Sequence, residues 1–242
     1  MQVEQALFTS AQTRHARGYH LVARSSGITD NMAKALAVWS PSHDSLVESH
    51  AAAESLNYYR LNDEWAALTR SVNGESEYSN RGGLRLETNM LVFRASQLAG
   101  YDYHPLLLAD TALSLGHLRL RDRTPQQLGT IELPQSSWGR IDEPGINEEA
   151  SHEFAVRVIK QLTRSRVMII GAARPKMMVQ AVLDRLPPRV RGRVTFSTGL
   201  RPSLHRPFSL QFLPQLDDRL RDKMSSADVV CLDVPATVAL SH

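Results

Sequence analysis

The sequence predicts an α+β protein of two units: antiparallel hairpins with helices over residues 1–145, then a small α/β layer over residues 146–242. Short runs of alternating apolar and polar residues, joined by polar links, occupy much of the first hundred positions. After residue 146, apolar runs of strand length surround a helical pattern, which is typical of an α/β layer. Residues 119–145 are rich in charge, proline, glycine and glutamine without periodicity, so we expect a linker or an extended connection there.

Four runs in the first unit predict two hairpins. They pair residues 3–10 with 19–25, and residues 56–61 with 64–72, the second pair through the short polar link Asn62-Asp63.

Two helices are expected in the first unit. One covers residues 30–39, with Asp30 as its cap and Pro41 as its stop. The other lies near residues 105–113, where Pro105 suits the first helical position.

A further strand over residues 84–94 presents two different faces. Leu84, Leu86, Met90 and Val92 share one face at period two. We expect Arg85, Glu87 and Asn89, on the other face, to meet water or a partner.

The second unit combines helices with apolar strands. The expected helices cover residues 147–163, with an apolar stripe through Phe154 and Val158, and residues 175–186, opened by Pro175. The expected strands cover residues 166–171, 193–198, 208–213 and 227–234.

The net charge of +3 conceals a strong asymmetry along the chain. Residues 1–156 hold 13 basic and 19 acidic residues, whereas residues 157–206 hold 12 basic residues and one acidic residue. Arg189, Arg191 and Arg193 concentrate this basic window near a helix end, and we interpret them as candidate partner-binding residues.

Three kinds of partner could explain the basic window. Nucleic acid fits the charge. However, the window has a single aromatic residue, Phe196, and no helix-turn-helix or zinc-finger pattern. We therefore favour a partner protein, or an internal contact with the acidic first unit.

The stretch EYSNRGGLRLETN, residues 77–89, raises the question of a phosphate-binding loop. Paired glycines allow close backbone approach to an anion, but here they precede a strand instead of a helix. A turn explains them, and Arg81 with Arg85 becomes the place where we expect a partner contact. The alternative is that Arg81 only holds the turn.

The turn 171–176 lies between a buried strand and a helix, where open α/β sheets bind ligands. Gly171, Arg174 and Lys176 are therefore candidate ligand-binding residues. With one glycine the turn matches neither the dinucleotide-binding nor the Walker pattern, so an ordinary turn is the alternative.

No catalytic residue, metal site or cofactor is predicted. Glu149, His152 and Glu153 have the spacing of one of the two ligand segments that carboxylate-bridged di-metal sites use, but the sequence has no second Glu-x-x-His segment to complete such a site. The single cysteine, Cys231, cannot form an internal disulfide, and we expect it to be a buried apolar residue. Without a signal sequence or an apolar run of membrane-spanning length, we expect a cytoplasmic location.

Several segments in the same order carry a family resemblance. They are EQALFT (4–9), GYHLVARSSGI (18–28), EYSNRGG (77–83) with Thr88 and Leu91, FSTGLRPS (196–203) and RPF (206–208). In these segments the chain resembles bacterial GTPase-associated adaptor proteins, specifically the N-terminal domain of the second type followed by the family's middle domain.

The resemblance implies a non-enzymatic adaptor of a GTPase-centred conflict or defence system, and it supplies no catalytic residues. Family members continue into a largely helical C-terminal region, so we expect a short member or an N-terminal portion. The alternative function is a sensor of a small ligand or nucleotide at the turn 171–176 or the turn at Arg81.

Overall fold

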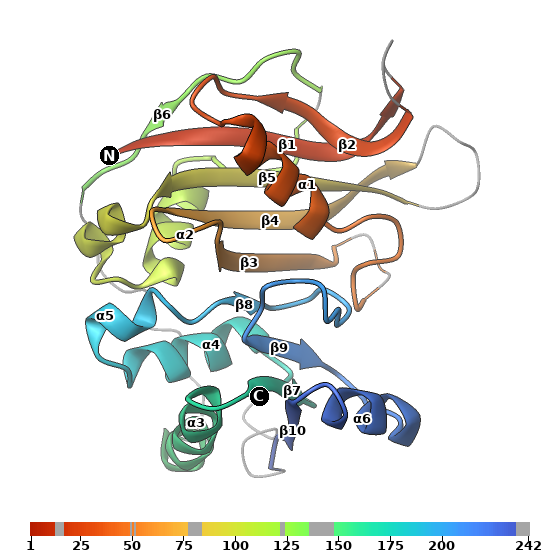
Figure 1. Cartoon of the computed structure of the whole chain (residues 1–242), viewed down its shortest axis with the longest axis vertical. Helices are drawn as coiled ribbons and strands as arrows, with labels where there is room; N and C mark the ends of the chain where they lie inside the picture. The colour runs from red at the N-terminus through yellow and green to blue at the C-terminus, as the bar shows by residue number, and fades with distance from the viewer. Residues whose placement is uncertain are drawn as a thin grey trace.

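A computed structural model describes residues 1–12, 17–48, 50, 52–76, 84–121, 124–135 and 148–235. Ten strands form one mixed sheet in the order β10-β7-β9-β8-β3-β4-β5-β1-β2, with β6 paired to β1 (Figure 1). Helices cover both faces of this sheet, so the predicted α+β class is confirmed.

The predicted hairpins are present. Strand β1 (Gln2–Gln12) pairs antiparallel with β2 (Arg17–Arg24), and β3 (Glu54–Arg60) pairs antiparallel with β4 (Trp65–Ser76). In the second turn, Asn62 Oδ1 accepts hydrogen bonds from the backbone N–H groups of Glu64 and Trp65 at 2.9 and 2.8 Å. Strand β5 (Leu84–Arg94) lies between β4 and β1.

Helix α1 (Asp30–Trp39) covers one face of this sheet, burying Met32 and Leu36. Its cap differs from the prediction. The hydroxyl of Thr29 accepts a hydrogen bond from the Met32 N–H, so Thr29 is the N-cap and Asp30 the first helical residue.

The opposite face is covered by the 3-10 helix η1 (Ala95–Tyr101) and by α2 (Pro105–Ser114), which begins at Pro105 as predicted. Of the linker or extended connection expected over residues 119–145, the described residues up to 135 form an extended connection packed against the sheet. Leu128 and Leu133 are buried there, and β6 (Ile131–Glu132) pairs with β1. Residues 136–147 lie outside the described part.

The second half contributes four parallel strands. These are β7 (Arg166–Ile170), β8 (Phe196–Ser197), β9 (Leu210–Leu213) and β10 (Val229–Asp233). Helices α3 (Glu148–Leu162) and α4 (Pro175–Asp184) match their predictions, whereas α5 (Pro188–Arg191) and α6 (Asp218–Ser225) were not expected.

Helices of the second half lie on opposite faces of the sheet. Side chains of α3 and α4 pack with Val167 and Ile169 of β7, whereas Met224 of α6 packs with Met168 and Ile170. The β7–α4 and β9–α6 connections therefore leave the sheet toward opposite sides.

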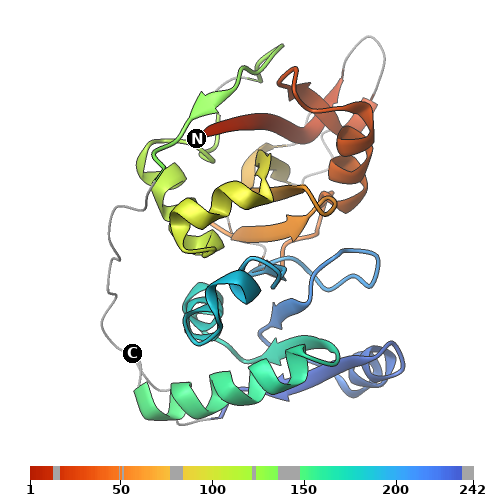
Figure 2. The ribbon, with the colours of Figure 1, turned by 60° about the vertical axis from the view of Figure 1, so that its left-hand side comes forward.

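Strand β8 joins the two halves by pairing antiparallel with β3, Asn57 opposite Ser197 and Tyr58 opposite Phe196. Figure 2 shows the halves stacked along the common sheet. One apolar core also runs across the junction, since Tyr58 and Leu68 belong to the same cluster as Phe196 and Val182. The boundary near residue 145 falls outside the described residues and stays a prediction.

Candidate functional site

Part of the basic window is used inside the molecule. Three contacts cross from the second half to α2 and the turn before it. They are the ion pairs of Arg191 with Asp102 and of Lys176 with Asp110 at 2.6 Å, and the contact of His104 Nε2 with Asp184 Oδ1 at 3.2 Å. These contacts fit the internal role considered for the window, because each joins a side chain of α4 or α5 to the first half.

Of the three predicted partner-binding arginines around α5, Arg191 is the one that is partly buried and hydrogen-bonded within the molecule. Its side chain is 12% exposed, and it donates to the backbone carbonyl of Leu186 at 2.9 Å as well as to the Asp102 carboxylate. Nearby, the Tyr58 hydroxyl donates to the carbonyl of Gly192 at 2.7 Å. Burial raises the pKa of Tyr58 to about 12, which keeps this donor protonated at neutral pH.

Arg189 and Arg193 instead point to solvent. Both are exposed, and neither side chain makes a hydrogen bond or ion pair within the described part of the chain. Val190, 40% exposed, lies between them in sequence. We call Arg189, Val190 and Arg193 the α5 surface; it lies at the junction of the two halves (Figure 1).

The other two predicted partner-binding residues, Arg81 and Arg85, provide less support for an exposed binding surface. Arg81 lies outside the described residues, with Gly82 and Gly83. Arg85 is half-buried on β5, and its Nε is buried without a hydrogen-bond partner among the described residues. Its neighbours on the same face differ from expectation: Glu87 and Asn89 are 1% and 3% exposed, so the idea that they face water is wrong.

Arg121 explains this burial, and sequence reasoning missed it. Its backbone N–H donates to Glu87 Oε1, its Nε to Asn89 Oδ1, and its Nη2 to Gln5 Oε1, each at 3.1 Å. The segment that contains Arg121 lacks periodicity, so its sequence does not predict that it covers a face of the sheet.

A cleft of about 260 Å³ lies at the carboxyl ends of β7, β8 and β9. It contains two of the three predicted ligand-binding residues. Gly171 ends β7 with a φ of 80°, a left-handed conformation that favours glycine. Arg174 and Lys176 line the cleft with Thr198, Gly199 and Leu213, and Glu48 and Glu54 line it from the first half.

The charges of the cleft are largely paired. Lys176 pairs with Asp110, Glu54 with Arg70, and Glu48 with His50 at 2.6 Å. Arg174 is exposed, and its guanidinium contacts only the sulfur of Met177 at 3.6 Å among the described residues. Among the described lining residues, Arg174 therefore carries the unpaired positive charge of the cleft.

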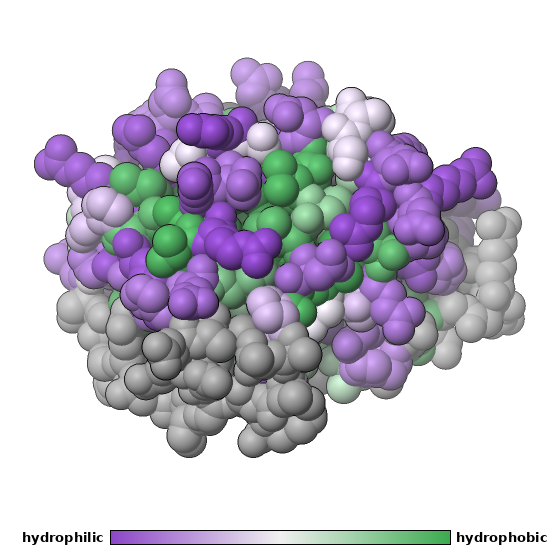
Figure 3. All heavy atoms as spheres, turned by 90° about the horizontal axis from the view of Figure 1, so that it is seen from below, coloured by the Kyte–Doolittle hydropathy of each residue, from purple (hydrophilic) through white to green (hydrophobic). Residues whose placement is uncertain are grey.

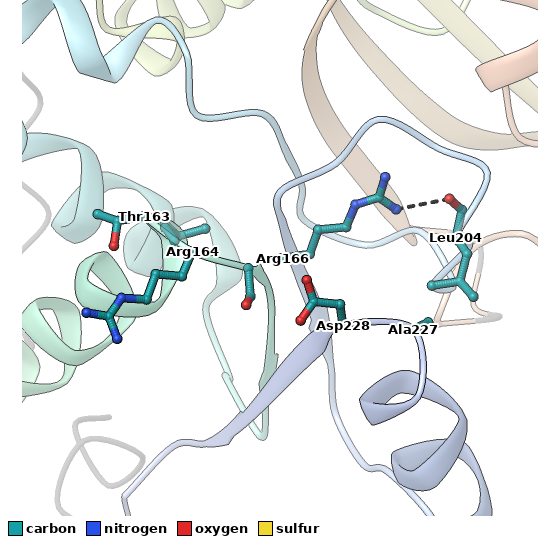
Figure 4. Close-up of a pocket in the computed structure, with 8 residues that line it drawn as sticks. Thr163, Arg164, Arg166, Leu204, Ala227 and Asp228 are labelled. Carbon is teal, nitrogen blue, oxygen red and sulfur yellow. Dashed lines mark hydrogen bonds between the residues drawn. The ribbon is translucent and has the colours of Figure 1, made fainter.

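A second cavity, of about 570 Å³, opens at the amino ends of β7 and β10. Figure 4 shows that its arginines do not converge: Arg166 donates to the carbonyl of Leu204 at 3.0 Å, whereas the guanidinium of Arg164 points away from Asp228. The two arginines of this cavity therefore do not point toward a common position where they could bind one ligand group.

The sheet ends at β2 on one side and at β10 on the other. The end of the molecule formed by α3, β10 and α6 shows apolar surface surrounded by hydrophilic side chains (Figure 3). Val156 of α3 is 48% exposed, and Val230 and Cys231 of β10 are half-buried. Burial also raises the pKa of the Cys231 thiol, which disfavours the reactive thiolate.

Metal and membrane features were also sought in the described residues. No group of three or more histidine, cysteine, aspartate or glutamate side chains there could hold a metal ion. None of the helices described is long and apolar enough to cross a membrane.

Together these features define a class: an α+β protein whose two halves share one sheet, with an exposed arginine surface at their junction. Residues 2–135 match the family model "GTPase-associated protein 1, N-terminal domain type 2", and the chain belongs to this family. The family name associates the chain with a GTPase system. Comparison with curated proteins and with solved structures gave no match. The middle domain expected over residues 146–242 stays a prediction.

Proposed function

We propose that this chain is a cytoplasmic, non-enzymatic adaptor or scaffold of a bacterial GTPase-centred conflict or defence system. In this role it binds a partner GTPase or effector protein. Membership of a GTPase-associated family supports the kind of partner, and the α5 surface supports the mode of binding.

The observation that carries the proposal is the free charge of the α5 surface. Arg189 and Arg193 expose two guanidinium groups beside an exposed valine, without an acidic partner in the described residues. Arginine is enriched at protein interfaces, where it combines an apolar stem with several hydrogen-bond donors. The expected partner surface is therefore acidic.

A protein suits this surface better than nucleic acid does. Ion pairs neutralise two of the twelve basic residues of the window, Arg191 through Asp102 and Lys176 through Asp110. The α5 surface itself offers two guanidinium groups and an exposed valine, whereas nucleic-acid affinity depends on many phosphate contacts.

We assign no catalytic residue. The histidine–carboxylate pair His104–Asp184 lies at the junction with His104 only 1% exposed, which leaves a substrate no access to its ring.

Binding of a GTPase of the same proposed system tests the proposal. The variant Arg189→Glu/Arg193→Glu should lose capture of the GTPase in a pull-down. The matched control is Arg219→Glu/Lys223→Glu on α6, which reverses the same number of exposed charges elsewhere. Equal capture by wild type and both variants would show that the α5 surface does not contribute to binding. We leave Arg191 unchanged, because its loss would also disturb the junction.

A further inference from the structure

The cleft at the carboxyl ends of β7, β8 and β9 lies at a point where the direction of the chain connections reverses. Strand β7 leads through α4 and past β9 to β8, whereas β9 leads through α6 and past β7 to β10. Since these connections run on opposite faces, the loops after β7 and β9 part from each other. Open α/β sheets bind ligands in the crevice that such a reversal leaves.

We propose that this cleft binds a small phosphorylated molecule that also carries hydrogen-bond donors, of the size of a nucleoside monophosphate or smaller. This binding site is independent of the α5 surface. The volume of about 260 Å³ sets the upper size, because it falls just below the usual range for ligand pockets. Lining residues come from both halves of the chain, so a bound ligand would contact both.

Arg174 is the residue that would bind the phosphate of the ligand. Its guanidinium has five N–H donors, and in the described residues only the weakly accepting sulfur of Met177 lies near them. The Thr198 hydroxyl, which accepts a hydrogen bond from the Leu56 N–H at 2.9 Å, retains its own O–H to donate into the cleft. A phosphate would satisfy both groups, whereas a cation would leave both unpaired.

Glu48 lines the same cleft from the first half of the chain, with its carboxylate largely exposed, and we assign to it the other end of the ligand. One carboxylate oxygen contacts His50, and the remaining acceptor capacity faces outward. Glu54 is already engaged by Arg70 and Lys176 by Asp110, so they add no free charge. The complementary ligand therefore carries N–H or O–H groups in addition to its phosphate.

Calorimetric titration with two probes, GMP and inorganic phosphate, tests the assignment. Wild type should bind both, GMP more tightly. Arg174→Ala should weaken each probe by about tenfold or more, as expected for loss of a charge-assisted hydrogen bond. The control Arg164→Ala removes an exposed arginine at the opposite end of β7 and should bind like wild type. Arg174 is exposed and makes no capping hydrogen bond, so its replacement leaves the fold intact.

The variant Glu48→Gln tests binding of the donor groups of the ligand separately from binding of its phosphate. It should lower the ratio of GMP affinity to phosphate affinity several-fold, since only GMP has donors that reach this side. Absence of binding by either probe would overturn the proposal. So would equal affinities in wild type and Arg174→Ala, because the bound anion would then lie elsewhere.

Discussion

At the scale of single residues, Arg121 shows how a charged side chain can organise a buried face. Strand β5 places Glu87 and Asn89 toward the sheet face that the segment after α2 covers, and Arg121 from that segment bonds to both. The period-two pattern of β5 predicts two faces correctly. It does not reveal which segment covers the polar one, because that contact joins residues more than thirty positions apart.

Replacement of Arg121 tests this arrangement. Arg121→Ala should lower the free energy of unfolding by about 1–3 kcal/mol, since it leaves the buried acceptors of Asn89 and Gln5 unpaired. Arg119→Ala, an exposed arginine two positions earlier, should change it by less than about 0.5 kcal/mol. Urea unfolding measures both, and equal effects would contradict the role given to Arg121.

The buried Tyr58 predicts a pH dependence. Its pKa is raised to about 12 by burial, so the folded state holds the phenol proton more tightly than the unfolded state does. The associated stability is complete below pH 10 and is lost as the pH rises toward 12. Tyr58→Phe should therefore show a shallower fall in unfolding free energy between pH 10 and 12 than wild type. Parallel pH profiles would show that Tyr58 does not contribute.

At the scale of elements, long periodic segments were predictable and short ones were not. The strands β1 to β5 and the helices α1, α2, α3 and α4 follow their patterns closely. Helix α6 has only Met224 buried, so its sequence carries no apolar stripe. Helix α5 has four residues and buries none of them, and it is held instead by Arg191 and the turn that follows.

The docking of α5 can be measured with a double-mutant cycle. Arg191→Ala should destabilise the protein by about 1–3 kcal/mol, because several hydrogen bonds to the first half and to α4 are lost together. Coupling to Asp102→Ala should be roughly 1 kcal/mol, reduced by the exposure of the aspartate. Arg189→Ala should be nearly neutral. A cycle without coupling would contradict the ion pair.

At the scale of the whole molecule, the two predicted units share a sheet and a core. The pairing of Tyr58 with Phe196 joins strands that are distant in the sequence, and no local pattern predicts which strand will be the neighbour of another. For the candidate site, sequence reasoning located the turn at Gly171 and the arginines of α5. It could not separate Arg191 from Arg189 and Arg193, because only the packing of α5 decides which of them is buried.

The common core predicts cooperative unfolding. Tryptophan fluorescence reports on Trp39, Trp65 and Trp138, which all precede residue 146 in the sequence. Far-ultraviolet circular dichroism reports on all helices, including α3, α4 and α6. The two probes should give the same urea midpoint, because unfolding either half exposes core shared with the other. Separate midpoints would show that the halves unfold as independent domains.

The affinity of the chain for the proposed partner GTPase, measured at low and high salt, tests the central claim most directly. An acidic partner on the α5 surface predicts that wild type binds more weakly as salt rises, because exposed charges are screened. It also predicts that Arg189→Glu/Arg193→Glu loses most of the affinity at low salt, whereas Arg219→Glu/Lys223→Glu retains it. Wild-type affinity in the α5 variant at both salt concentrations would contradict the proposed interface.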